Sequence, residues 1–427
     1  MRKFIVLIIT LFFLGIVPSR GQYTVLHNFG SFVGDGSSPY GSLILSGNLL
    51  YGMTDRGGTF NYGCIFVIDT NGNDYKVLHN FDSVYGSNPE GSLTVFGKIL
   101  YGTAGAGGAY NYGCLFSMDT NGTGYKDLFD FNGTNGEGPG SLILSDGKLY
   151  GMTISGGTGL GNLYSIDTDG SDYKNLVNFN GSNGFEPRGS LTLSGNVLYG
   201  MTSETSFYGN VFSIDTDGSG DKDLYTFSSI GSDGFGPDGS LILSAGRLYG
   251  LSTKGGFHRY GNVFSIDTNG AGYKDLFDFN GANGSFPNGS LTLSGGVLYG
   301  MAAHSGAYKG GTIFTIDTSG NGFKVLYNFN FSTGIAPYGD LTLSGNTVYG
   351  MTNLGGADSE GVIFSFNYTT VGINEVQANN EQLNVYPNPA LDNITIEMNV
   401  SKKQDIQISI YSHLGQWSNR FLMHLLH

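Results

Sequence analysis

The sequence contains few of the residues that serve catalysis, redox chemistry or long-range electrostatic attraction. Among 427 residues there are two cysteines, one tryptophan, seven histidines and ten prolines. Only 13% of residues are charged, and the formal net charge is −14. Because nucleic acids and anionic membranes are bound by cationic surfaces, this composition argues against both as partners. No transmembrane segment is expected in the mature chain, since a spanning helix needs about 20 apolar residues.

The longest apolar run lies at the N-terminus and is too short to span a membrane. It covers residues 4–17, follows Arg2 and Lys3, and is followed by small residues up to Gly21. A basic start, a short apolar stretch and a small-residue cleavage site are typical of a secretory signal peptide. We therefore expect residues 1–21 to be a signal peptide that exports the chain across the inner membrane.

Glycine and aromatic residues, by contrast, are abundant. The chain has 72 glycines, and 14% of its residues are Phe, Tyr or Trp. The usual glycine share is about 7%. A glycine-rich chain with few aromatics is typical of disorder, whereas glycine with many aromatics is typical of short strands joined by tight turns.

A Leu-Tyr-Gly triplet, Val-Tyr-Gly in the last copy, recurs seven times at intervals of 49 or 50 residues. Such a fixed period indicates stacked copies of one supersecondary unit. The seven tyrosines are Tyr51, Tyr101, Tyr150, Tyr199, Tyr249, Tyr299 and Tyr349. Cys64 and Cys114 occupy equivalent positions one repeat apart, usually beyond the ~7 Å limit for a disulfide. We predict two buried thiols.

Each repeat has four β-type segments, illustrated by the fifth copy. The segments cover 239–244, 247–251, 263–267 and 273–279. Short turns with Gly or Asn-Gly separate the first from the second and the third from the fourth, so the strands form an antiparallel meander. Both faces of the meander are apolar and need a neighbour on each side. Radial stacking as a β-propeller meets this need.

The two ends of the array predict that the ring is closed. A fourth-strand pattern at 23–29 stands alone before the first full unit, and the last unit stops after its third strand at 362–366. Segment 23–29 therefore completes the last blade and removes the open sheet edges. We predict an all-β fold, a seven-bladed β-propeller of four-stranded antiparallel blades over residues 22–369.

The recurrent lysine of the fourth strand indicates how each blade is oriented. A regular charge belongs at a solvated rim, whereas the first strand carries small residues suited to a crowded axis. The strands should therefore run from axis to rim in sequence order. The lysines are Lys76, Lys126, Lys174, Lys222, Lys274 and Lys324.

The longer connections between strands share one face of a meander, and their sequences differ in variability. A proline precedes each first strand, where its fixed φ and missing N–H serve a structural role. The loops after the second strands vary most and mix aromatic with polar residues, a combination suited to saccharides. The same aromatics would also fill gaps between blades. The candidate ligand-binding residues are Arg56, Tyr62, Tyr110, Tyr112, Tyr208, His258, Arg259, Tyr260, His304, Tyr308 and Lys309.

Neither a cofactor site nor a catalytic motif is evident. The third-to-fourth turns, such as Asp69-Thr70-Asn71-Gly72, are similar to calcium loops but lack the later ligands and the bidentate Glu. Asp capping of turn N–H groups explains them as well. Nucleophile-elbow, zincin and phosphate-loop patterns are absent. Carboxylates converging from different blades would still allow glycoside hydrolysis, which needs two acids about 5–10 Å apart.

The C-terminal segment differs from the repeats in composition. After a polar linker at 370–382 comes Val385-Tyr386-Pro387-Asn388-Pro389, and later Ile410-Tyr411 with Gly415-Gln416. These motifs resemble the C-terminal sorting domain of the type IX secretion system of Bacteroidota. The resemblance implies a small β-sandwich recognised by that secretion machinery. The tail from Trp417 does not alternate as the remaining strands of that family do, so 383–427 is expected to be a truncated sorting domain, which leaves passage across the outer membrane open.

The repeat itself resembles the GloVer tandem repeat. Its signature here is Leu50-Tyr51-Gly52-Met53-Thr54, then Gly57-Gly58, then Gly63-Cys64-Ile65-Phe66, and the match covers about four-fifths of the chain. The family implies no established activity. We therefore expect a secreted or cell-surface binding module, monomeric, with glycan as the leading ligand class. A carbohydrate-active enzyme and a structural surface protein without a specific ligand are the alternatives.

Overall fold

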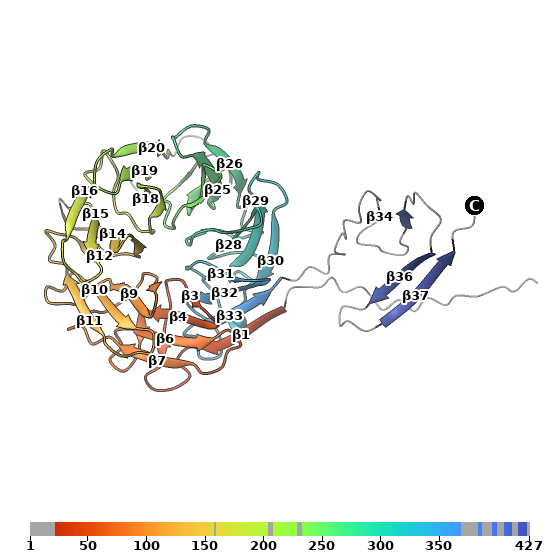
Figure 1. The fold of residues 1–427 in the computed structure, drawn as a ribbon, viewed down its shortest axis with the longest axis horizontal. Coiled ribbons are helices and arrows are strands. Elements are labelled where there is room, and N and C mark those ends of the chain that lie inside the picture. The colour runs from red at the N-terminus through yellow and green to blue at the C-terminus, as the bar shows by residue number, and fades with distance from the viewer. Residues whose placement is uncertain are drawn as a thin grey trace, which may run out of the picture. The chain divides into compact units, whose positions relative to one another are not determined.

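The repeat length and the tight turns produce seven antiparallel meanders arranged around one axis (Figure 1). The computed structural model describes residues 22–368 except 158, 204–207 and 229–232, together with strands at 383–386, 395–398, 405–411 and 417–424. The predicted signal peptide and linker lie outside the described residues. The predicted fold class, an all-β seven-bladed propeller with four-stranded antiparallel blades, is confirmed.

The first four blades have the following strands. Blade 1 consists of β3 (Ile44–Ser46), β4 (Leu49–Thr54), β6 (Cys64–Asp69) and β7 (Lys76–Asn80). Blade 2 consists of β8 (Thr94–Phe96), β9 (Ile99–Ala104), β10 (Cys114–Asp119) and β11 (Lys126–Asp130). Blade 3 consists of β13 (Ile143–Ser145), β14 (Lys148–Ser155), β15 (Asn162–Asp167) and β16 (Lys174–Asn178). Blade 4 consists of β17 (Thr192–Ser194), β18 (Val197–Thr202), β19 (Asn210–Asp215) and β20 (Lys222–Thr226).

The last three blades follow the same order. Blade 5 consists of β22 (Ile242–Ser244), β23 (Arg247–Ser252), β25 (Asn262–Asp267) and β26 (Lys274–Asp278). Blade 6 consists of β27 (Thr292–Ser294), β28 (Val297–Ala302), β29 (Thr312–Asp317) and β30 (Lys324–Asn328). Blade 7 consists of β31 (Thr342–Ser344), β32 (Thr347–Thr352), β33 (Val362–Asn367) and β1 (Gln22–Asn28).

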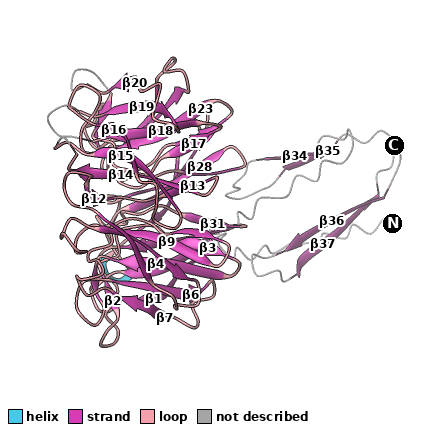
Figure 2. Cartoon of the chain, turned by 60° about the vertical axis from the view of Figure 1, so that its left-hand side comes forward, coloured by secondary structure: helices cyan, strands magenta, loops and turns pink. Residues whose placement is uncertain are grey.

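Each fourth strand continues into a connector that leads to the first strand of the next blade. The connectors carry the short strands β2 (Gly36–Ser37), β12 (Glu137–Pro139) and β21 (Gly234–Phe235) and the 3-10 turn η1 (Phe331–Thr333). β2 pairs with β5 (Arg56–Gly57), β12 with β14, and β21 with β24 (Lys254–Gly255). β2 and β12 lie at the same face of the disc (Figure 2), as expected for the long connections of a meander.

The lysine argument about blade orientation agrees with the structure. β7, β11, β16, β20, β26 and β30 lie at the outer rim, and each begins with its exposed lysine (Figure 1). Two of these lysines also reach the neighbouring blade: the Nζ of Lys222 donates to the carbonyl oxygen of Asn269 (3.0 Å), and that of Lys274 to Ser319 (2.7 Å).

The hydrophobic core lies between the blades, because both faces of each sheet are apolar. One cluster joins Tyr51, Met53 and Ile65 of blade 1 to Leu100 and Phe116 of blade 2, all nearly inaccessible to solvent. Equivalent clusters occur at the other interfaces. A single blade therefore has no core of its own, which is why the chain forms a ring.

The ring is closed by β1, the first described strand, which pairs antiparallel with β33 of the last repeat (Figure 1). The side chain of Asn28 accepts a hydrogen bond from the N–H of Ala357 (2.9 Å), as Asn80 does from Thr59 (2.8 Å) in blade 1. Phe29 donates its N–H to Gly361 and its side chain is fully buried. The N-terminal strand thus makes the same contacts as the fourth strand of an ordinary blade.

Stacked aromatic pairs join neighbouring blades near the rim. In each pair, the fifth residue of one fourth-strand segment stacks on the first residue of the next, with ring centroids 3.6–4.6 Å apart. The six pairs are His27–Tyr75, His79–Tyr125, Phe129–Tyr173, Tyr225–Tyr273, Phe277–Phe323 and Tyr327–Tyr23. Val177 and Asp221 occupy the two positions between blades 3 and 4, so that interface lacks the stack.

Restoring the missing stack is expected to stabilise the propeller. The double substitution Val177→Phe and Asp221→Tyr should raise the free energy of unfolding by about 1 kcal/mol, the usual value of an aromatic pair beyond its buried area. Asp221 gives up only an exposed hydrogen bond from Asn183. Chemical unfolding measures the gain, and Val177→Phe alone is the control. A double variant no more stable than this single one would contradict the expectation.

The two cysteines are free and buried, in agreement with the sequence analysis. The Sγ of Cys64 lies 3.3 Å from the hydroxyl of Thr54, and burial raises the pKa of the Cys64 thiol to about 12. Both thiols therefore stay protonated and unreactive at neutral pH.

The turns between third and fourth strands hold backbone N–H groups with an Asp or Asn side chain. This side chain comes from the first turn residue in Asp69 and Asp317 and from two residues later in Asn121, Asp169, Asp217 and Asn269. In Asp69 one carboxylate oxygen accepts from the N–H groups of Asn71 and Asn73, both at 2.8 Å. These bonds, from Asn73 foremost, lower the pKa of Asp69, and Asp317 repeats the arrangement. Among the residues that the structure describes, no group of three or more His, Cys, Asp or Glu side chains is placed to hold a metal ion.

The described residues of the C-terminal unit form two hairpins. β34 (Leu383–Tyr386) pairs with β35 (Thr395–Met398), and β36 (Asp405–Tyr411) pairs with β37 (Trp417–His424). β37 occupies the tail in which the sequence pattern shows no alternation.

Candidate functional site

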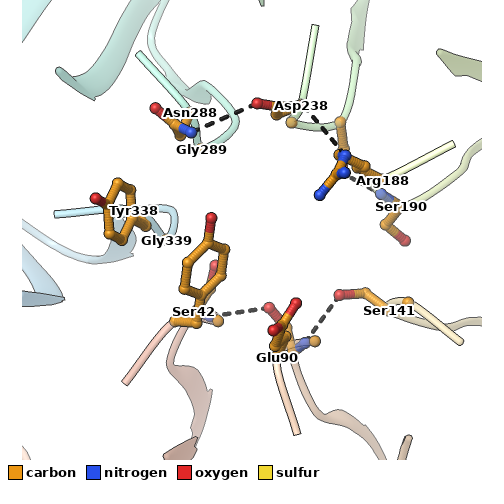
Figure 3. A pocket seen from close by; sticks show the side chains of 18 of the residues that line it. Ser42, Glu90, Ser141, Arg188, Ser190, Asp238, Asn288, Gly289, Tyr338 and Gly339 are labelled. Atoms are coloured by element: carbon orange, nitrogen blue, oxygen red, sulfur yellow. Dashed lines mark hydrogen bonds and ion pairs between the residues drawn. The ribbon is translucent and has the colours of Figure 1, made fainter. Parts of the chain in front are cut away.

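The connectors bring seven equivalent positions together around the axis. Each connector ends in Pro-x-Gly, except in the third repeat, where Pro139 is followed directly by Gly140. The residue between proline and glycine differs in almost every copy: Tyr40, Glu90, Arg188, Asp238, Asn288 and Tyr338. These six side chains line a hollow of about 260 Å³ at the axial end of the connectors (Figure 3).

The floor of the hollow is made of closely packed backbone. A Cβ atom added to Gly189, Gly239 or Gly289 would overlap the carbonyl oxygen of the next glycine around the ring, so only glycine fits there. The residues that come after the last glycine of each connector in the sequence form a circle of hydrogen bonds. In this circle the N–H of Ser42 donates to the hydroxyl of Ser92 (2.9 Å), and the N–H of Ser92 donates to the hydroxyl of Ser141 (2.8 Å). This rigid circle fixes where the six variable side chains begin.

One wall of the hollow is aromatic. The rings of Tyr40 and Tyr338 stack with centroids 4.9 Å apart and planes 24° from parallel. His304 contacts the ring of Tyr338 edge-on at 6.0 Å, and Phe286 contacts His304 at 5.9 Å. His304, one of the candidates from the sequence, therefore extends this wall.

The opposite wall is polar and largely paired. Arg188 lies 3.1 Å from a carboxylate oxygen of Glu186 and 3.9 Å from one of Asp238. The hydroxyl of Ser203 donates to a carboxylate oxygen of Asp238 at 2.9 Å. The side-chain amide of Asn288 lies 3.5 Å from the other carboxylate oxygen of Asp238 (Figure 3). Burial raises the pKa of Asp238, although Ser203 and the positive charge of Arg188 act against this rise.

Glu90 is the unpaired acid of the hollow. Within the described part of the chain, its carboxylate has no hydrogen-bond or ion-pair partner, although the side chain is open to the hollow. Loss of hydration, with the negative charge of Asp55, raises its pKa, and Arg188 opposes this. Burial together with the charges of Asp238 and Glu90 raises the pKa of Tyr40 to about 12. The charges of Glu90 and Asp238 thus both act, across the hollow, on Tyr40 of the aromatic wall.

Comparison with protein families agrees with the repeat pattern. Residues 11–106, 96–250 and 204–391 match the Gloeobacter/Verrucomicrobia repeat. The chain belongs to this family. Residues 384–419 match the secretion system C-terminal sorting domain, which implies the type IX secretion machinery and a secreted or cell-surface location. No helix within the described residues is long and apolar enough to cross a membrane.

Solved structures similar to this repeat protein share its fold at low sequence identity. An oligogalacturonate lyase in complex with manganese matches with a TM-score of 0.52 and 11% identity, covering 82% of this chain and 94% of that one. A puromycin-hydrolysing peptidase of Mycobacterium tuberculosis matches with a TM-score of 0.50 and 12% identity over 73% of this chain and 49%, about half, of that one. No curated protein matches the sequence.

The repeat protein uses four of the tyrosines that the sequence analysis selects to hold its connectors. The backbone carbonyls of these tyrosines accept hydrogen bonds from the connector that leaves the same blade, at 2.9–3.0 Å. The four are Tyr62, Tyr112, Tyr208 and Tyr260. The rings of Tyr112 and Tyr260 also lie against Gly133 and Gly281 of the connectors, and Tyr208 packs on Phe235.

The other selected residues lie exposed on the loops after the second strands. Tyr110 and Tyr308 are 58% and 63% exposed, and the side chain of Arg56 pairs with its neighbour Asp55. His258, Arg259 and Lys309 are also exposed. None of these side chains lines the hollow, so of the eleven candidates His304 alone is placed against it, through Tyr338.

The six variable residues of the Pro-x-Gly segments, Glu90 among them, are absent from the candidates of the sequence analysis. The reason is that the proline before each first strand has a structural explanation, the entry into that strand. A signal was nevertheless present. Proline and glycine are constant at this point, whereas the residue between them changes from Tyr to Glu, Arg, Asp and Asn. Variation confined to one position of an otherwise constant segment indicates a side chain that the fold does not need.

Proposed function

We propose that this secreted propeller is a binding module whose axial hollow takes a carbohydrate. The observation that carries the proposal is the stacked pair Tyr40 and Tyr338 facing Arg188, Asp238 and Asn288 across the hollow. Aromatic faces pack on the C–H surfaces of sugar rings, while charged and amide groups take the hydroxyls. The floor is rigid backbone, so little conformational entropy is lost on binding.

The proposal also includes the variable loops after the second strands, as ligand contacts outside the hollow. They lie on the face to which the connectors open, because connector and loop residues pair directly, as Ser285 does with His304. Tyr110 and Tyr308 expose their rings there. We propose that these side chains contact parts of a glycan that extend beyond the hollow.

Binding is favoured over hydrolysis by the state of the acids that line the hollow. Glycoside hydrolysis needs one carboxyl group that holds a proton and a second that is ionised, so the environments must shift their pKa values apart. Here the pKa values of Glu90 and Asp238 are both raised, and Asp238 is held by Ser203 and Arg188. Asp340 also lines the hollow and burial raises its pKa too, so the three acids are shifted in the same direction and supply hydrogen-bonding groups for a ligand.

The experiment is a glycan array with the secreted protein and the variants Tyr40→Ala and Tyr338→Ala. Each variant should lose at least about tenfold in affinity for the glycan that wild type binds, about 1.4 kcal/mol. Phe96→Ala, an exposed aromatic at a tight turn on the opposite face, is the matched control. Wild-type affinity in both tyrosine variants, with unchanged melting temperatures, would contradict the proposal. Release of reducing ends during the assay would instead favour a hydrolase.

A further inference from the structure

The ring of variable side chains around the hollow is interrupted at blade 3. There the ring residue is missing, and Gly140 follows Pro139 directly. A Cβ atom on Gly140 would find its nearest neighbour, the carbonyl oxygen of Arg188, at 3.5 Å, an ordinary contact, whereas the same atom on Gly189 would overlap its neighbour. Within the described residues, the circle of hydrogen bonds also lacks the link from Ser141 to Ser190.

The hollow extends outward at this interruption. Its lining includes Gly105 and Ala106 from the loop of blade 2 and Ile154 from the end of β14 in blade 3, and no described residue of the equivalent segments in the other blades. Ala106 occupies the position at which other repeats carry Arg56, Lys254 and His304. The absent ring residue and the small loop residues together leave a side groove that leads from the axis across blade 3.

The two sides of this groove carry opposite charges. Glu90 of blade 2 stands on one side with no partner among the described residues, and Arg188 of blade 4 stands on the other (Figure 3). Their charges interact, since Arg188 opposes the rise in the pKa of Glu90. A chain that leaves the hollow thus passes between a hydrogen-bond acceptor and a donor, which suits hydroxyl groups on both edges of a sugar ring.

We propose that the site binds an unbranched oligosaccharide by its end. The terminal sugar enters the hollow against Tyr40 and Tyr338, and the following units leave over blade 3 through the groove between Glu90 and Arg188. This inference rests on the proposed carbohydrate function and adds the ligand's form, a linear chain recognised at a terminus.

An extended peptide suits the groove less well. Peptides in the extended state bind through free backbone donors and acceptors of a strand edge. Of the N–H groups of residues 138–141, that of Gly138 donates to Tyr112 (3.0 Å) and that of Gly140 to Met152 (2.9 Å), and Pro139 has none. Among the described residues this leaves the N–H of Ser141 alone without a partner, too few donors to pair with an extended backbone. The groove floor therefore favours a ligand recognised by side chains.

The test fills the groove and leaves the hollow in place. An Asn inserted between Pro139 and Gly140 restores the length of the other connectors, and Ala106→His introduces the residue of the equivalent position 304. The probes are gluco-, galacto- and N-acetylglucosamine homo-oligosaccharides from mono- to hexasaccharide, with affinity measured by calorimetry. In wild type, affinity should rise about tenfold or more with chain length. Both variants should lose this rise and keep the affinity of the shortest ligand.

The matched control is the same Asn inserted between Asp146 and Gly147, in the tight turn on the opposite face of blade 3. An unchanged length dependence in Ala106→His, which folds independently of the insertion, would overturn the groove inference. If the tyrosine variants lose binding but the groove variants do not lose length dependence, only this inference fails. If the tyrosine variants bind normally, the proposed function fails as well. Displacement of the oligosaccharide by extended peptides, blocked by Ala106→His, would assign the groove to peptides.

Discussion

A chain that lacks residues 22–30 is expected to lose the cooperative unfolding transition of the propeller. The deletion removes β1 and with it Phe29, which is fully buried, and Tyr23, which stacks on Tyr327 at 4.2 Å. Removing one buried Phe side chain costs about 3–5 kcal/mol, and whole domains are stable by only about 5–15 kcal/mol. The free edge of β33 would also be exposed to pairing with other chains.

Thermal unfolding followed by circular dichroism checks this expectation, with a chain that begins at residue 22 as the control. A synthetic peptide of residues 22–30 should restore the transition, because it can add to the edge of β33 as a strand. A deletion variant that melts at the wild-type temperature would show that β1 does not hold the ring closed.

The second large effect is expected from Asp35, whose buried carboxylate links the closing strand to blade 1. It accepts hydrogen bonds from the ring of His27 (3.0 Å), the hydroxyl of Tyr75 (2.7 Å), the N–H of Gly36 (2.8 Å) and both donors of Ser31 (3.1 Å). Asp35→Ala leaves these buried donors unpaired. It should lower the free energy of unfolding by about 3–5 kcal/mol, as measured by chemical denaturation.

The same carboxylate should make stability depend on pH in the acid range. Burial acts to raise the pKa of Asp35, but hydrogen bonds from His27, Tyr75 and Ser31 outweigh it and lower the pKa below the ordinary value. Its stabilising contribution is therefore complete above the ordinary aspartate pKa of about 3.9 and is lost as pH falls through the lower, folded value. Asp35→Asn removes the titrating group and is the control. Parallel stability curves for wild type and Asp35→Asn below pH ~4 would refute this account.

The sequence predicts the blades well because each repeat carries its own strand signals. Asn-Gly and Ala-Gly turns, such as Ala245-Gly246, lie between the strands where expected, and the lysines of the fourth strands lie at the rim. Seven copies of the same pattern reinforce one another, so an error in one copy does not change the architecture. The free thiols of Cys64 and Cys114 follow from the same periodicity.

The hollow is harder to predict because its residues come from seven places in the chain and are joined only by ring closure. Tyr40 and Tyr338 stack although almost the whole propeller separates them in sequence. Their position after a constant proline looks structural within a single repeat. The aromatic pairs between blades are hidden for a similar reason: His27 and Tyr75 belong to different repeats, and neither repeat alone shows the contact.

Ring closure also orders folding in time. Asn28 and Ala357, which meet in the last blade, are 329 residues apart. During synthesis and export, the first strand of the propeller emerges before all others and stays unpaired until the seventh repeat has followed. Contacts between such distant segments form slowly, because the loop between them must close first. The propeller therefore completes its ring only after the seventh repeat is available to pair with β1.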